Sequence, residues 1–127
     1  MSLARSAALA ALLGLMAAPA VAQKGWSSVG RAKIDSEAAT GTLEVKWQPG
    51  YREIMLCAEG NSVKLDTLVL QFRDGKSQPV KLRARLADGG CSKTASVARN
   101  RDVATADVSY DRASLAGGKT RLQLYAR

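Results

Sequence analysis

The sequence has 127 residues, with 19 lysines and arginines against 11 aspartates and glutamates and a formal net charge of +8. Hydrophobic residues make up 46% of the chain, which is typical of a folded domain and argues against disorder. Histidine is absent, so Ser-His-Asp and Cys-His catalytic schemes and histidine-based zinc sites are excluded.

The first 22 residues have the pattern of a secretory signal peptide. Arg5 precedes an apolar run over residues 7–16, and Ala20-Val21-Ala22 is the small-x-small site that a signal peptidase requires. The run is shorter than the roughly 20 apolar residues that span a bilayer, so we expect no transmembrane segment. We expect cleavage near Ala22 and a mature domain over residues 23–127, periplasmic or secreted, with a net charge of +7 after the loss of Arg5.

Apolar and polar residues alternate along most of the remaining chain, with the period of a β-strand. Turn signals such as Pro49-Gly50, Asp74-Gly75 and Gly117-Gly118 separate the alternating segments. In chain order, the predicted strands cover residues 42–47, 52–58, 63–72, 80–86, 94–98, 103–110 and 120–125.

Seven or eight short strands at this spacing predict an all-β domain. A single antiparallel β-sandwich is favoured over a barrel, because one face of each strand is polar and the other would pack against a second sheet. Only two cysteines are present, Cys57 and Cys91. An even number in an exported chain favours a disulfide between them, which would stabilise the fold by roughly 3–4 kcal/mol. The alternative is two separate thiols.

Lys81, Arg83 and Arg85, here named the basic segment, form a row of cations in the most regular predicted strand. Alternation places them on the solvent side, about 6.5–7 Å apart. They are the predicted ligand-binding residues, for an acidic envelope polymer or an acidic protein. If their strands are neighbours, the row would be joined by Arg99, Arg101, Arg112 and Arg121. The alternative is a solvated edge whose cations discourage aggregation between sheets.

Residues 113–120 match a permissive phosphate-loop pattern, but Thr120 opens an alternating strand instead of a helix. Because a phosphate loop holds its anion at a helix N-terminus, a Gly-Gly turn is the preferred interpretation. The acidic residues are scattered, and no Asp-x-Asp loop or carboxylate pair indicates a calcium or glycosidase site. No catalytic residue, metal site or cofactor is predicted.

The aromatic residues are few, with two Trp, three Tyr and one Phe, and several have core-facing spacing, so no stacking platform for sugars or single-stranded nucleic acid is predicted. Trp26, Trp47 and Tyr51 would form an aromatic ligand surface if they were exposed together. Trp47 aligns with Leu43 and Val45, which favours core packing for its ring. The position of Trp26 stays open.

Short motifs spread along the chain also resemble a known family. Gly25-Trp26 and Val29-Gly30 begin the domain, and Arg52-x-Ile54 follows. The later motifs are Phe72-x-Asp74-Gly75 with Gln78 and Val80, Arg101-x-Val103 with Tyr110, and Leu122-x-Leu124-Tyr125. In this order they are similar to a family of small exported bacterial β-sandwich domains of uncharacterised function. The resemblance implies the fold and the exported location, and it carries over neither a catalytic residue nor the two cysteines.

These features together predict an exported, non-enzymatic binding module of unknown partner; if the basic segment is functional, the ligand is an acidic envelope polymer or an acidic protein. Two other classes of function stay open. One is a structural or assembly protein that uses a sheet edge or an apolar patch, and the other is an inhibitor of an envelope-acting enzyme.

Overall fold

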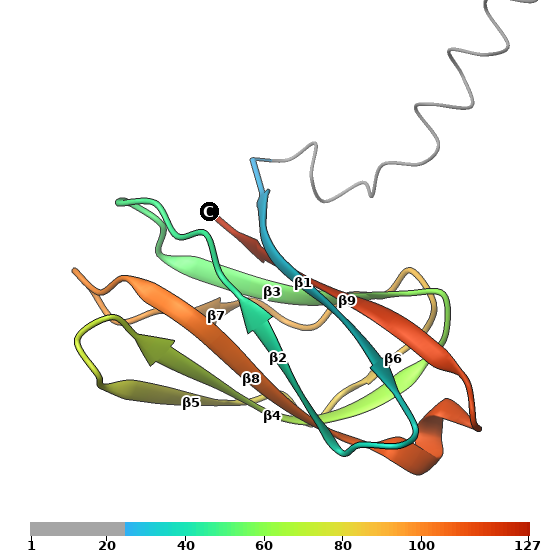
Figure 1. Cartoon of the computed structure of the whole chain (residues 1–127). Helices are drawn as coiled ribbons and strands as arrows, with labels where there is room; N and C mark the ends of the chain where they lie inside the picture. The colour runs from blue at the N-terminus through green and yellow to red at the C-terminus, as the bar shows by residue number, and fades with distance from the viewer. Residues whose placement is uncertain (1–24) are drawn as a thin grey trace, which may run out of the picture.

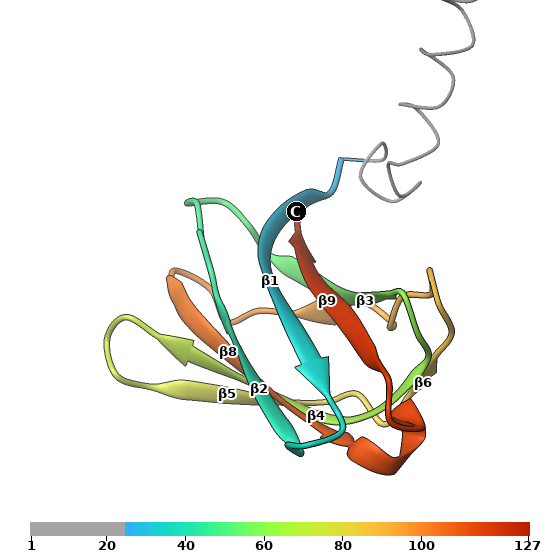
Figure 2. The ribbon, with the colours of Figure 1, turned by 45° about the vertical axis from the view of Figure 1, so that its right-hand side comes forward.

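The computed structural model describes residues 25–127, so the predicted signal peptide lies outside the described residues. Within them, nine strands pair in antiparallel fashion and form two sheets. Figures 1 and 2 show the two sheets as layers that face each other. The first sheet has the order β1-β9-β3-β7, built from β1 (Ser27–Asp35), β9 (Lys119–Ala126), β3 (Glu53–Glu59) and β7 (Ala95–Ser96). The second has the order β2-β8-β4-β5, built from β2 (Thr40–Glu44), β8 (Val103–Asp111), β4 (Val63–Phe72) and β5 (Ser77–Lys81), and the short β6 (Arg85–Leu86) also pairs with β4.

The inner faces of the two sheets enclose one apolar core. Alternate residues of the central strands point inward, and Leu56, Leu70, Val108 and Leu124 are each at most 1% exposed. Burial of such side chains stabilises the fold by about 1.5–3 kcal/mol each. The predicted all-β antiparallel sandwich is confirmed.

A second, smaller apolar cluster covers the outer face of the first sheet. Met55 and Cys57 of β3 and Tyr125 of β9 point away from the main core and pack with Trp26. Cys57 forms a disulfide with Cys91, which confirms the predicted bridge. Backbone hydrogen bonds on both sides, from Ala58 N–H to Gly90 O and from Ser92 N–H to Leu56 O, hold the 89–92 segment against β3.

Three parts of the chain differ from the sequence-based expectation. β1 was not predicted, because only Val29 and Ile34 are buried in it and a register shift between Ser28 and Gly30 breaks the alternation. The predicted strand over residues 80–86 is interrupted between β5 and β6. No helix was predicted over residues 112–115, but they form the 3-10 helix η2 (Arg112–Leu115). Its N-cap Asp111 accepts a hydrogen bond from Ala113 N–H.

The loops divide between the two ends of the sandwich (Figure 1). The β2–β3 loop, the β4–β5 turn, the β7–β8 loop and the C-terminus lie at one end, here named the pocket end. The β1–β2 turn, the β3–β4 turn and η2 lie at the other. In the described part of the chain, no helix has the length and hydrophobicity needed to cross a membrane.

Candidate functional site

The basic segment lies at a free edge of the second sheet. Lys81 ends β5, Arg85 opens β6, and Arg83 lies between the two strands. All three side chains are exposed, but they do not share one continuous strand, so the predicted even spacing along a strand is wrong.

A β-bulge causes the interruption. Thr67 of β4 is paired with Lys81 and Lys64 of β4 with Arg85, so residues 82–84 face only residues 65–66. The N–H groups of Leu82 and Arg83 both donate to Asp66 O, at 3.1 and 2.9 Å, and Arg83 has a φ of 39°. A bulge adds one residue to one strand and bends it, which breaks the regular alternation at Arg83.

The structure adds one cation to this edge that the sequence did not indicate. Lys64 lies directly opposite Arg85 on one side and Asp111 on the other. Like charges in directly opposite positions destabilise a sheet, and Asp111 offsets part of this repulsion. Arg83 lines a hollow of about 420 Å³ with Lys64, and Asp66 and Asp111 contribute carboxylates to the same hollow.

The four other arginines named with the basic segment do not form one row with it. Arg121 belongs to the first sheet, opposite Lys33 of β1, and its guanidinium lies 3.9 Å from Glu59. Arg101 forms an ion pair with Asp74 at 2.7 Å and stacks over the Phe72 ring. Arg99 lines a pocket at the pocket end, and Arg112 opens η2 at the opposite end of the sandwich.

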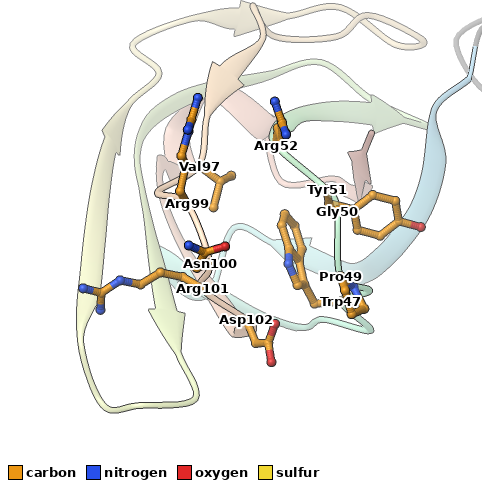
Figure 3. A pocket seen from close by; sticks show the side chains of 10 residues that line it. All are labelled: Trp47, Pro49, Gly50, Tyr51, Arg52, Val97, Arg99, Asn100, Arg101 and Asp102. Carbon is orange, nitrogen blue, oxygen red and sulfur yellow. The ribbon is translucent and has the colours of Figure 1, made fainter.

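The pocket at the pocket end, here named the end pocket, is lined by aromatic, apolar and cationic residues, which Figure 3 labels. It has a volume of about 300 Å³, and its lining comes from residues 47–52 of the β2–β3 loop and 97–102 of the β7–β8 loop. Trp47 and Tyr51 are both half-buried and meet edge to face, with ring centroids 5.1 Å apart. The expected core packing of Trp47 holds for part of its ring only, because the same residue lines this pocket.

Sequence reasoning missed this assembly. It paired Trp47 and Tyr51 with Trp26, but Trp26 is 7% exposed and lies under the Arg127 guanidinium, 4.4 Å from its ring centroid. It grouped Arg99 with the basic segment. The missing signal was contact between two loops that are far apart in the sequence, and no local pattern encodes that contact.

Two tyrosines have perturbed ionisation. Burial raises the pKa of Tyr110 and that of Tyr125 above the ordinary value, because a buried phenolate loses hydration. The Tyr110 hydroxyl donates to Asp35 O at 2.9 Å, and the Tyr125 hydroxyl lies 2.6 Å from Gln123 Oε1. Both groups therefore stay neutral around pH 7 and act as structural donors.

The segment that matches a phosphate-loop pattern has a structural role. It contains the end of η2, a turn and the start of β9. The Thr120 hydroxyl lies within hydrogen-bond distance of the carbonyl oxygens of Glu59 and Asn61, at 2.8 and 3.0 Å. A phosphate loop leads from a strand into a helix, and here the turn leads into a strand.

The fold and these surfaces define the chain as a small antiparallel β-sandwich domain with one disulfide, a basic edge and an aromatic end pocket. A model of the family described as Domain of unknown function (DUF2541) matches residues 7–126, and the chain belongs to this family. The expected membership of an uncharacterised family is thereby confirmed. No curated protein matches the sequence.

Several solved structures resemble the chain weakly. AlgX from Pseudomonas aeruginosa superposes with a TM-score of 0.49 at 7% sequence identity, over 80% of this chain and 26% of AlgX. A mutant of the family 29 carbohydrate binding module CBM29-2 gives a TM-score of 0.39 at 10% identity, over 82% of each chain. The CBM22-1-GH10 modules of Clostridium thermocellum xylanase 10B give 0.31 at 10% identity, over 81% of this chain and 26% of that one.

Proposed function

We propose that the protein is an exported, non-enzymatic binding module that recognises an acidic polymer of the cell envelope through Lys81, Arg83 and Arg85. One observation carries the proposal: all three side chains are exposed along one free sheet edge, and none is in an ion pair with another residue in 25–127. Lysine presents a point charge and arginine a planar fork of donors, which together suit phosphates and carboxylates.

Export is supported by two features of the chain. The N-terminal pattern is that of a signal peptide with cleavage near Ala22. The Cys57–Cys91 bridge is the kind of bond that persists in oxidising compartments. The mature domain would then begin at residue 23 and meet the polymers of the envelope.

The position of these cations at a sheet edge suits a second role besides binding. Exposed cations on an edge strand also discourage edge-to-edge aggregation, and this role requires no ligand. The two roles differ in their salt dependence, because binding to a polyanion releases counterions and weakens steeply with salt.

The experiment measures binding to a panel of polyanions (lipopolysaccharide, teichoic-type polymers and peptidoglycan) over a range of salt concentrations. The test variant is Arg83→Asn with Arg85→Ser, since asparagine tolerates the positive φ at position 83. The control is Arg31→Ser with Lys33→Ser, which removes the same charge from exposed strand positions on the first sheet.

The expected result is saturable binding to one polymer, weakened in the test variant and retained in the control. The slope of log affinity against log salt should fall by roughly one for each lost contact. The basic segment is a solvated edge and not a binding site if both variants lose affinity equally. The same holds if every polymer binds weakly and this binding vanishes at physiological salt.

A further inference from the structure

The end pocket has an apolar base and a polar rim. Val97 is 7% exposed and lies at the base with the two half-buried aromatic rings, and the rim carries Arg52, Arg99, Asn100 and Asp102. Small-molecule sites combine apolar walls with a few convergent polar groups in about 300–1,000 Å³. A volume of about 300 Å³ is at the lower limit of that range, so the pocket suits one small unit of a ligand.

Both loops that line the pocket are fixed by hydrogen bonds. Val97 N–H donates to Arg52 O at 2.8 Å, which joins the two loops directly, and Arg52 N–H donates to Arg127 O at 2.8 Å. The Gln78 side chain binds the second loop twice, donating to Ser96 O at 2.9 Å and accepting from Ala98 N–H at 3.0 Å. A preorganised pocket loses little conformational entropy when a ligand binds.

The charge on the rim is positive. Arg101 is occupied by Asp74 and Phe72, and Figure 3 shows its side chain directed away from Trp47. Arg52 and Arg99 are exposed and form no ion pair with another residue in 25–127. They outnumber the single rim carboxylate of Asp102. Two free guanidinium groups beside an apolar base select an anion, and guanidinium binds carboxylate through paired hydrogen bonds.

The aromatic rings select the body of the ligand. The face of an indole or phenol ring carries partial negative charge, and the C–H groups of a sugar ring carry partial positive charge and form an apolar face. We propose that the end pocket binds one carboxylate-bearing sugar ring, a uronic acid unit, with the ring against Trp47 and the carboxylate paired with the exposed guanidinium group of Arg52 or Arg99. The inference rests on the proposed function for its ligand class, an acidic envelope polymer, and narrows that class to uronic acid polysaccharides.

The pocket and the basic segment are connected through one strand. Gln78, which holds the loop that carries Arg99, belongs to β5 and precedes Lys81 of the basic segment by three residues. At about 3.3 Å per residue, Lys81 lies about 10 Å further along the edge. A polymer with one unit in the end pocket can therefore continue along β5 toward the basic segment.

The experiment measures calorimetric binding of two probes to protein purified from the oxidising compartment of a host that expresses the full chain. One probe is a galacturonic acid tetramer, and the other is the same tetramer with its carboxylates reduced to alcohols. The acidic tetramer should bind at least about 10-fold more tightly than the reduced one, because each charged hydrogen bond to arginine is lost with the carboxylate.

Variants then locate the site. Arg52→Gln with Arg99→Gln should lower the affinity for the acidic tetramer by at least about 10-fold, and Arg31→Gln with Lys33→Gln should leave it unchanged. Both substituted arginines are exposed, so the unfolding midpoint in urea should not move. In a Trp26→Phe background, the remaining indole is Trp47, and its fluorescence should change when the acidic tetramer binds.

The outcomes separate this inference from the proposed function. Equal affinity for the two tetramers, or no effect of the Arg52 and Arg99 substitutions, overturns the uronic acid site even if a polymer still binds through the basic segment. The end pocket is supported if the Arg52→Gln, Arg99→Gln variant no longer binds the acidic tetramer and the Arg83→Asn, Arg85→Ser variant still binds it. If that result occurs without binding of any envelope polymer, the pocket stands and the proposed function of the basic segment fails.

Discussion

Removal of the Cys57–Cys91 bridge should lower the free energy of unfolding by about 4 kcal/mol. The two cysteines are 34 residues apart in the sequence, and the chain-entropy model gives about 3.8 kcal/mol at 25 °C for a closed loop of about 35 residues. Domains of this size have a total stability of about 5–15 kcal/mol. The loss is therefore a large fraction of the whole, and a domain near the lower limit would be partly unfolded without the bridge.

Equilibrium unfolding in urea measures the effect in three samples: oxidised protein, reduced protein and the Cys57→Ala, Cys91→Ala variant. Reduction keeps both side chains in the cluster with Met55 and Tyr125, so it isolates the bridge from the packing of sulfur atoms. The m-value should rise on reduction, because the unfolded chain without a cross-link exposes more surface.

A difference between oxidised and reduced protein below about 1 kcal/mol, at the same m-value, would refute this reasoning. It would mean that the 89–92 segment stays close to β3 in the denatured ensemble without the bridge, so that the cross-link removes little entropy from the unfolded chain. The alanine variant should match the reduced protein apart from the lost packing of the two sulfur atoms.

Two further predictions follow from particular contacts. Lys33 lies directly opposite Arg121, so Lys33→Glu should stabilise the protein by about 0.2–1 kcal/mol and raise its melting temperature. Lys46→Glu is the control. An unchanged melting temperature would mean that the repulsion between Lys33 and Arg121 is already screened. Tyr110→Phe removes the hydrogen bond to Asp35 O and should cost about 0.5–1.5 kcal/mol at pH 7. Because burial raises the folded-state pKa of Tyr110 above 10.0, its neutral form contributes stability that is complete below pH 10 and is lost as the pH rises through the folded-state pKa. Stability measured by urea unfolding above pH 10 should therefore fall less steeply in the Tyr110→Phe variant than in the natural protein, and parallel profiles would contradict this account.

The central strands were predictable because each has one face in the core. β4 and β8 alternate buried residues with residues that are more exposed along most of their length, which is the pattern that sequence analysis detects. β1 was not detectable in this way. It lies at an edge, has only Val29 and Ile34 fully buried, and contains a register shift between Ser28 and Gly30. A Cβ at Gly30 would lie 2.8 Å from Glu44 O, so close packing between strands, which no local pattern shows, fixes that glycine.

The candidate sites divide in a similar way. Exposure of Lys81, Arg83 and Arg85 follows from alternation with Leu82, Ala84 and Leu86 and was predicted. The bulge was not, because it arises from unequal residue counts between β4 and its partner, and a sequence does not display the register of a partner strand. The end pocket depends on the contact between Val97 and Arg52, which is a property of the tertiary fold alone.

Free cations are common in this protein, so the surroundings of each one decide how strongly it attracts an anion. With 19 basic and 11 acidic residues, at least eight cations lack an acidic partner wherever the chain places them. Most such residues remain hydrated at a surface, where single charges contribute little. Arg52 and Arg99 differ from the others because they border a cavity with an apolar base and two aromatic rings. An anion bound against such a base would itself be partly shielded from water, and its attraction to a guanidinium group would be stronger there than at an open surface. The same argument predicts that substitution of Arg52 or Arg99 affects binding more per charge removed than substitution of Arg83 or Arg85, although all four residues carry the same guanidinium group.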